Sequence, residues 1–270
     1  MDIARPRGEV ADLLEGGHRQ ERFRDIVLPE VTLDLLSRIV RENRARAELE
    51  QWQVTPRRRL LFQGPPGCGK TLAAAVLAGE LGLPLMTVRF DALFSRFLGA
   101  TANHLRLIFD ELPRRPGVYL FDEFDAVGQR RAHEQDVGEM RRIVTSFLQL
   151  IDTDRSASLI IAATNHPELL DRAVFRRFDV EIGFELPNAA QLAQLLALRL
   201  TPFDISKTFL KQVAERVSGL SYADAARACD DAIRAMVLDG ASALSESYLV
   251  CALEDMHRKH ERRAASSPSK

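Results

Sequence analysis

The sequence of 270 residues contains only three cysteines, no long apolar run and almost no net charge. Cys68, Cys229 and Cys251 have neither paired spacing nor an even number, which disfavours a disulfide framework and favours thiols in a reducing compartment. The 37 basic and 38 acidic side chains nearly cancel, so no whole-molecule field attracts nucleic acid or an acidic membrane. No apolar stretch reaches the length of a membrane span, and the first residues do not resemble a signal peptide. These absences predict a cytoplasmic protein with no membrane partner and disfavour nucleic acid as a partner.

The chain does contain a glycine-rich turn between an apolar strand and a helix. Residues 59–63 read Arg-Leu-Leu-Phe-Gln, residues 64–71 read Gly-Pro-Pro-Gly-Cys-Gly-Lys-Thr, and an alanine-rich helical segment follows. The three glycines allow backbone N–H groups to converge on phosphate oxygens, and the positive end of the helix favours the anion. In this pattern Lys70 reaches the β- and γ-phosphates and the Thr71 hydroxyl ligates Mg²⁺. The alternative is a glycine turn that contains a lysine by chance. The strand before the turn and the helix after it disfavour this alternative. The predicted nucleotide-binding residues here are Pro66, Gly67, Cys68, Gly69, Lys70, Thr71 and Leu72.

A second apolar strand ends in two carboxylates. Residues 118–121 are apolar, and Asp122 and Glu123 follow them. At the carboxyl edge of a parallel sheet, Asp122 would lie beside Thr71 and hold Mg²⁺ through water. Glu123 would polarise the water that attacks the γ-phosphate. The alternative is that Asp122 and Glu123 belong to an ordinary acidic turn between a strand and a helix. The phosphate loop, which lies one strand-helix unit earlier in the chain, disfavours this alternative. ATP and Mg²⁺ are therefore the expected cofactors, and ATP hydrolysis is the expected reaction.

Strands and helices alternate through the first two thirds of the chain. Continuous apolar strands between helices predict an α/β fold, a P-loop NTPase with a parallel sheet between helices, followed by a small all-α lid domain. The expected strands are 59–63, 84–90, 117–121, 158–164 and 178–184, and the expected lid helices are 189–200, 207–217, 222–238 and 245–257. The expected domains are a flexible or loosely helical segment at 1–22, a large α/β ATPase domain at 23–186, a small α-helical lid domain at 187–260 and a disordered tail at 261–270.

With these motifs in order, residues 23–257 resemble the AAA branch of the AAA+ ATPases. The strand end Ala-Ala-Thr-Asn that closes with Asn165 is similar to the family's sensor 1, and residues 169–179 are similar to its second region of homology. The resemblance implies that Asn165 hydrogen-bonds the attacking water or the γ-phosphate. It also implies that Arg177, with Arg176 as its companion, is an arginine finger that reaches the nucleotide of a neighbouring subunit. A homo-oligomer, in this family a hexameric ring, follows from such fingers.

The start of the expected lid helix is also similar to the family. Residues 218–225 read Ser-Gly-Leu-Ser-Tyr-Ala-Asp-Ala, where the family has Ser-Gly-x-Ser-Gly-Ala-Asp near the adenine. Tyr222 replaces the usual glycine, and Ala223 occupies the place where other AAA+ enzymes carry a sensor 2 arginine. The resemblance implies that Ala223 and Ile26 lie near the base. In the phosphate loop, Cys68 replaces the usual threonine or serine.

A further resemblance concerns the segments that would contact a substrate. The triplet formed by Phe97, Leu98 and a glycine is similar to the family's first pore loop, which grips an extended polypeptide in the ring's channel. Phe97 is the implied substrate contact, with Leu98 packing beside it; the alternative is that Phe97 belongs to the core, which its polar neighbours disfavour. Arg130, Arg131 and His133 fall where the second pore loop would be, and they would either line the channel or be solvated.

These features predict a bare motor module with no attached catalytic domain. It would remodel, unfold or thread a protein substrate, with a separately encoded protease or other effector as a candidate partner. His133 and Glu134 begin like a zinc-protease motif, but the second histidine is missing, so no metalloprotease centre is expected. One alternative is a nucleic-acid-associated loader or transposition helper, favoured by the arginines at 57–59 and 262–263 and disfavoured by the neutral net charge. Another is a nucleotide-gated scaffold with slow hydrolysis.

Overall fold

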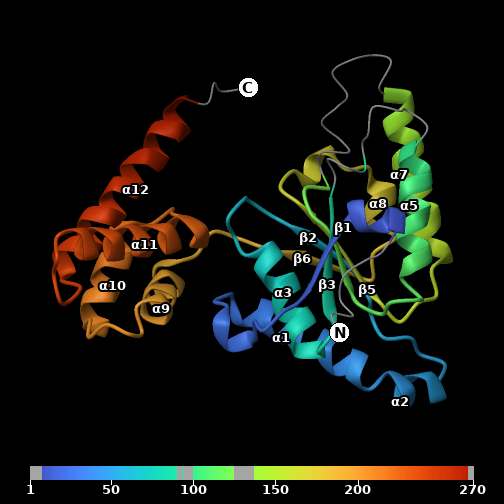
Figure 1. Ribbon diagram of the computed structural model, residues 1–270, viewed down its shortest axis with the longest axis horizontal. Helices are drawn as coiled ribbons and strands as arrows, with labels where there is room; N and C mark the ends of the chain where they lie inside the picture. The colour runs from blue at the N-terminus through green and yellow to red at the C-terminus, as the bar shows by residue number, and fades with distance from the viewer. Residues whose placement is uncertain (1–7, 90–92, 94–99, 125–136, 267–270) are drawn as a thin grey trace. The chain divides into compact units, whose positions relative to one another are not determined.

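The computed structural model describes residues 8–89, 93, 100–124 and 137–266, which Figure 1 draws as ribbon. The chain divides into two compact units, and it passes between them more than once. The first unit takes in Met1–Arg24, Glu30–Gly64 and Lys70–Phe184, and the second takes in Asp25–Pro29, Pro65–Gly69 and Glu185–Lys270. Among the described residues, no helix is long and apolar enough to cross a membrane.

The first unit is built on a six-stranded sheet in the order β1-β3-β4-β5-β2-β6. Five strands are parallel, and β1 runs antiparallel to β3 at the edge. Every residue of β4 and β5 is buried, as expected of apolar strands covered on both faces. The α/β P-loop fold is therefore confirmed. The strands are β1 Leu14–His18, β2 Arg59–Gln63, β3 Pro84–Val88, β4 Val118–Phe121, β5 Leu159–Thr164 and β6 Val180–Gly183.

Helices cover both faces of this sheet (Figure 1). On one face α3, which follows the phosphate loop, packs on the sheet with α1 beside it, and its run of small and apolar residues is almost entirely buried. On the other face, α5 and α7 contribute Phe109 and Phe147 to a cluster with Tyr119 and Phe121 of β4. The helical elements of this unit are α1 Glu30–Arg44, α2 Arg46–Gln51, α3 Lys70–Leu81, α5 Ala100–Glu111, α7 Val137–Thr153 and α8 Arg172–Phe175, with the short 3-10 turns η1 Gly8–Asp12, η2 Phe23–Asp25 and η4 Pro167–Leu169.

The amino-terminal segment differs from the sequence-based expectation. Residues 8–18, expected to be flexible or loosely helical, form η1 and β1. Leu13 and Leu14 are buried in the core cluster, and the Arg89 N–H donates to the Leu13 carbonyl at 2.9 Å. The edge of β3 thus supplies the hydrogen bonds that the glycine-rich segment at 14–18 needs to form a strand.

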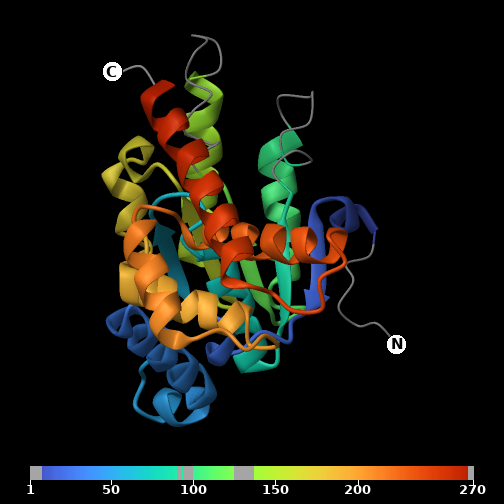
Figure 2. The same ribbon diagram turned by 90° about the vertical axis from the view of Figure 1, so that its left-hand side faces the viewer.

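The second unit contains four helices around their own apolar core. They are α9 Ala189–Arg199, α10 Lys207–Arg216, α11 Tyr222–Leu238 and α12 Glu246–Ser266, and Figure 2 shows α12 in red lying against α11. Leu192, Leu196, Ala228 and Leu249 are among the fully buried side chains of this core. The helical region expected after residue 187 is present. However, α12 continues well beyond His257 into the tail that was expected to be disordered, because its charged sequence consists largely of good helix formers.

Candidate functional site

Lys70 lies where β2 and β5 end side by side. In the parallel ladder Gln63 pairs with Thr164, so β2 leads into Gly64 at the same edge where β5 leads into Asn165. The Lys70 side chain is buried, and its Nζ donates to the Gly64 carbonyl at 2.6 Å and to Asn165 Oδ1 at 2.8 Å. A buried ammonium needs acceptors of this kind, because it has three donors and no acceptor of its own. The structure thus brings the predicted residues Lys70 and Asn165 together.

Thr71 meets the two carboxylates that follow β4 at this same edge. The Thr71 hydroxyl donates to Asp122 Oδ2 at 2.6 Å, and Asp122 Oδ1 accepts the backbone N–H of Glu123 at 2.9 Å. Glu123 is exposed and has a φ of +52°, a left-handed conformation that is uncommon for residues other than glycine. The next residue, Phe124, is buried and donates its N–H to the Ala163 carbonyl at 2.8 Å, which ties this turn to β5. A strained backbone that presents a carboxylate is typical of functional sites.

Oxygen donors dominate this group. The Thr71 hydroxyl and the Asp122 carboxylate are the hard ligands that Mg²⁺ prefers, so the donor set fits the expected ion. No group of three or more His, Cys, Asp or Glu side chains that could hold a metal lies within the described ranges. A magnesium ion at Thr71 and Asp122 would therefore take its remaining ligands from water and nucleotide phosphates, as Mg²⁺ does in phosphate-handling sites.

The tip of the phosphate loop, Pro65–Gly69, belongs to the second unit and contacts the start of α11 there. Gly67 has a φ of +77°, and a Cβ at this position would lie 2.5 Å from Ser221 Oγ and 3.2 Å from the Ala223 Cβ. The Ala223 N–H donates to the Gly67 carbonyl at 3.1 Å. Only glycine permits this approach of loop and helix. The predicted Ala223 is therefore a neighbour of the phosphate loop.

The other side of the loop tip faces residues 25–29. A Cβ on Gly69 would lie 3.9 Å from Ile26 Cδ1 and 3.8 Å from Leu28 Cδ2, and both of these apolar side chains are buried. Cys68 is fully buried, and its thiol lies 3.9 Å from the Pro66 carbonyl. The structure thus gathers Ile26, Cys68 and Ala223 at one place in the second unit. Two further predicted residues, Pro66 and Leu72, are exposed.

Arg177 and Arg176 follow the short helix α8, whose first turn is capped by Asp171. Both arginines are exposed, as a residue reaching another subunit must be. The Arg177 guanidinium forms an ion pair with Asp152 Oδ2 at 2.8 Å, and the two side chains remain 47% and 35% exposed. A solvent-exposed ion pair of this kind contributes little stability, so Arg177 can leave Asp152 and bind another anion at little cost.

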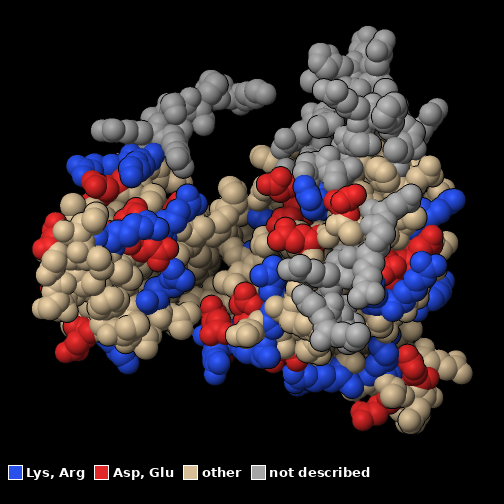
Figure 3. Space-filling view, viewed as in Figure 1, with Lys and Arg blue, Asp and Glu red and all other residues tan. Residues whose placement is uncertain are grey.

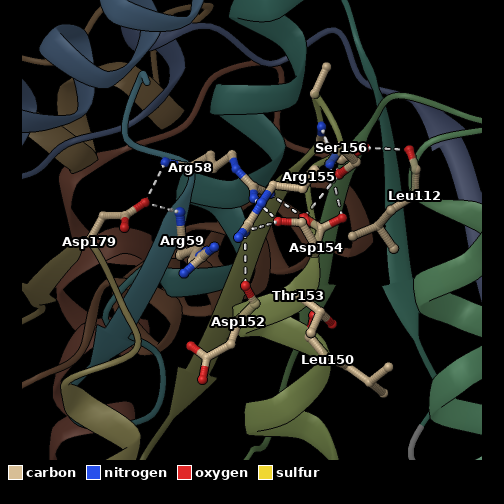
Figure 4. A network of polar contacts seen from close by, with 12 residues as sticks. Arg58, Arg59, Leu112, Leu150, Asp152, Thr153, Asp154, Arg155, Ser156 and Asp179 are labelled. Atoms are coloured by element: carbon tan, nitrogen blue, oxygen red, sulfur yellow. Dashed lines mark hydrogen bonds and ion pairs between the residues drawn. The ribbon is translucent and has the colours of Figure 1, made fainter. Parts of the chain in front are cut away.

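The region around Arg177 is tied to the sheet by a polar network (Figure 4). Asp179 Oδ2 accepts the backbone N–H groups of Arg58 and Arg59 at 2.9 and 3.0 Å. The Arg58 side chain, only 9% exposed, forms an ion pair with Asp154, whose side chain is 5% exposed. This network joins the start of β2, the end of α7 and the loop after α8, so the segment that carries Arg177 has a fixed base.

Several predicted residues lie outside the part of the chain that the structure describes. They are Phe97 and Leu98 of the proposed first pore loop, and Arg130, Arg131 and His133 of the proposed second. Conversely, sequence reasoning missed two groups that the structure brings to predicted residues, the Gly64 carbonyl under Lys70 and the Asp152 carboxylate beside Arg177. Asp152 carries no local signal, because an acidic residue near a helix end is commonplace.

The strand β2 leads through a glycine-rich loop into a helix that begins with Lys-Thr, and Asp-Glu follows the parallel strand β4, which β5 separates from β2. This arrangement defines a P-loop nucleoside triphosphatase. The model of the family described as "ATPase family associated with various cellular activities (AAA)" matches residues 60–186. An "Uncharacterized AAA family ATPase y4kL" from Sinorhizobium fredii is 37% identical over 96% of this chain and 78% of its own length. The chain belongs to the AAA family of ATPases, and it is therefore an enzyme that hydrolyses ATP.

Two longer proteins are also similar. An "ATPase with bromodomain protein abo2" from Schizosaccharomyces pombe is 36% identical over 66% of this chain and 16% of its own length. An "ATPase family protein 2 homolog" from Caenorhabditis elegans is 30% identical over 74% of this chain and 29% of its own length. The chain thus corresponds to a small part of these two relatives and to most of the Sinorhizobium protein.

Proposed function

We propose that this ATPase binds ATP and Mg²⁺ through the loop from Pro66 to Leu72 and hydrolyses ATP with Asp122, Glu123 and Asn165. The contact of Thr71 with Asp122 and the contacts of Lys70 with Gly64 and Asn165 carry the proposal, because they bring the expected metal and phosphate ligands to one sheet edge. Glu123 acts as general base, and Asn165 orients the attacking water or the γ-phosphate. Ile26 and Ala223 lie near the base of the nucleotide.

The proposal extends to the assembly. A large ATPase domain at 23–186 and a small helical lid domain at 187–260 form one subunit of a homo-oligomer, a hexameric ring. Arg177, with Arg176 beside it, acts in trans on the nucleotide of the next subunit. The exposure of both arginines and the weak, solvated pair of Arg177 with Asp152 support this role.

The work done by this ring is the remodelling, unfolding or threading of a protein substrate, with Phe97 and Leu98 as the gripping residues. A separately encoded protease or effector is the proposed kind of partner, and the cytoplasm is the proposed location. The nearly equal numbers of basic and acidic side chains disfavour the nucleic-acid alternative, and both signs of charge occur on the face of each unit that Figure 3 shows. A nucleotide-gated scaffold would differ from such a motor in its negligible turnover of ATP.

Steady-state ATP hydrolysis tests the site. Lys70→Ala should lose Mg·ATP binding, whereas Lys211→Ala, a matched change on the exposed surface of α10, should bind as the wild type does. Glu123→Gln should bind ATP and hydrolyse it very slowly. Retained tight binding in Lys70→Ala would refute the loop assignment, and normal turnover in Glu123→Gln would refute the base. Negligible wild-type turnover under all conditions would instead favour the scaffold.

Mixed assemblies test the sharing of the site. Arg177→Ala should bind ATP but lower kcat by about a thousandfold or more, the effect typical of a missing arginine finger. Mixing it with Lys70→Ala should restore part of the activity, because a Lys70→Ala subunit still offers Arg177 to its neighbour. No recovery in any mixing ratio would contradict action in trans.

An unfolded polypeptide tests the motor. It should raise the ATPase rate of the wild type, and Phe97→Ala should lose this stimulation while keeping the basal rate. Trp52→Ala is the control, because Trp52 is 81% exposed at the end of α2 and has no assigned role. Salt-dependent DNA binding that persists in Phe97→Ala, with no response to polypeptide, would favour the nucleic-acid alternative.

A further inference from the structure

Lys70 and Asn165 are joined by a hydrogen bond at the edge where β2 and β5 end. Lys70 is only 6% exposed, and its Nζ donates to Asn165 Oδ1 at 2.8 Å and to the Gly64 carbonyl at 2.6 Å. All three residues belong to the first unit. The residue that binds the β- and γ-phosphates in the proposed site is thus bonded directly to the residue that orients the attacking water.

The two acceptors of Lys70 differ in their freedom to move. Gly64 contributes a backbone carbonyl, and its own N–H donates to the Thr164 carbonyl at 3.2 Å. A Cβ on Gly64 would lie 1.9 Å from the Phe184 carbonyl oxygen, so the neighbouring backbone leaves Gly64 little room to shift. Asn165 contributes the end of a half-buried side chain, which can turn away by a change of rotamer. A competing acceptor for Lys70 would therefore displace Asn165 and not Gly64.

The number of donors on Lys70 decides which nucleotide competes with Asn165. An ammonium group has three N–H donors and no acceptor. With ATP, the β-phosphate, the γ-phosphate and the Gly64 carbonyl would use all three donors, which leaves none for Asn165. With ADP there is no γ-phosphate, so the β-phosphate, Gly64 and Asn165 can each accept one. The Lys70–Asn165 hydrogen bond is therefore compatible with ADP and incompatible with ATP.

We propose that Asn165 and the γ-phosphate of ATP compete for one donor of Lys70, so that Asn165 lowers the affinity of the site for ATP relative to ADP. The inference rests on the proposed nucleotide site and deepens it. Binding of the γ-phosphate to Lys70 releases the Asn165 side chain, which then orients the attacking water. Asn165 is thus held by Lys70 until a nucleotide that can be hydrolysed is in place.

Nucleotide titration of the full chain tests this competition. The comparison is made in the Glu123→Gln background, so that ATP is not consumed during the measurement. Adding Asn165→Ala to this background should lower the Kd for Mg·ATP by about five- to tenfold and leave the Kd for Mg·ADP unchanged. The gain for ATP is the typical difference between a hydrogen bond to a charged group, which no longer has to be given up, and the neutral one that Asn165 forms with water.

The sign of the change distinguishes this proposal from a simple contact. A residue that only touched the γ-phosphate would weaken ATP binding when removed, so an unchanged or higher Kd for Mg·ATP would overturn the proposal. An equal gain for Mg·ATP and Mg·ADP would also overturn it, because the hydrogen bond would then oppose both nucleotides. Asn103→Ala in the same background is the matched control, since Asn103 is exposed on α5. Both of its Kd values should stay unchanged, and a gain for ATP as large as that of Asn165→Ala would overturn the proposal.

Lys70→Ala separates this inference from the proposed function. If the wild type binds Mg·ATP and Lys70→Ala does not, while Asn165→Ala fails to tighten ATP binding, the competition alone is wrong. If the wild type bound no Mg·ATP, or if Lys70→Ala bound it equally well, the proposed site and the competition would both be wrong.

Discussion

Replacing Asp154 with alanine removes one partner of a buried ion pair at the start of β2. The side chains of Arg58 and Asp154 are 9% and 5% exposed, so water reaches neither of them freely. Asp154 also accepts the Ser156 N–H and the Ser156 hydroxyl, each at 3.1 Å. The substitution would leave the Arg58 guanidinium buried with the backbone carbonyl of residue 154 as an acceptor but without a counter-charge.

The expected cost follows from that burial. Breaking a buried pair by removing one partner typically costs about 3–5 kcal/mol, because the remaining charge is desolvated without compensation. Asp152 provides a matched control two residues earlier, since it also pairs with an arginine, but its side chain is 35% exposed and that of Arg177 is 47% exposed. An exposed pair of this kind contributes about 0–1 kcal/mol, so Asp152→Ala should have little effect on stability.

Urea denaturation followed by far-ultraviolet circular dichroism measures the difference. With a slope of about 3 kcal/mol per molar urea, Asp154→Ala should lower the midpoint by about 1–2 M. Trp52 is too exposed for its fluorescence to report unfolding well. Amide hydrogen exchange in β5 reports the stability of the first unit alone, so it separates a loss of stability there from one in the second unit. Equal and small effects of the two substitutions would refute the reasoning, and the double variant Arg58→Met, Asp154→Leu should recover most of the loss.

Two further predictions concern a glycine and the thiols. Gly64 has a φ of +144°, and a Cβ at this position would lie 1.9 Å from the Phe184 carbonyl oxygen. In urea denaturation, Gly64→Ala should therefore lower the free energy of unfolding by about 2 kcal/mol or more. Gly183→Ala is the control and should cause no such loss, because a Cβ on Gly183 would meet nothing within 4 Å. Maleimide at neutral pH should modify the exposed Cys251 and spare the buried Cys229. Burial raises the pKa of the Cys229 thiol to about 12, so almost none of it is present as the reactive thiolate. Mass spectrometry of the labelled peptides checks this prediction, and early labelling of Cys229 would contradict it.

Much of the first unit could be predicted from local sequence. β4 and β5 are continuous apolar runs, and a residue that directly follows such a run must lie at the carboxyl edge of a parallel sheet. For this reason the sequence predicts Asp122 beside Thr71, whereas the prediction for Asn165 depended on the resemblance of its strand end to the family's sensor 1. The four helices after residue 187 were likewise evident from their apolar spacing, including the bounds of α11.

Other parts depend on contacts that no local pattern encodes. β1 reads Leu-Glu-Gly-Gly-His, which has neither alternation nor β-branched residues, and it is a strand only because the edge of β3 pairs with it. The pair of Arg177 with Asp152 joins two segments that meet only after the sheet has formed. The Tyr222 hydroxyl has no hydrogen-bond partner among the described residues, which the sequence could not predict because it depends on how distant segments pack.

The left-handed backbone of Glu123 has an evolutionary consequence. A residue with a side chain at a φ of +52° is strained, and glycine or asparagine would relieve that strain. In a library selected only for folded, protease-resistant protein, position 123 should therefore drift toward glycine or asparagine. In a library selected for ATP turnover, glutamate should persist despite its conformational cost. Sequencing both libraries would separate the demands of folding from those of chemistry at a single position.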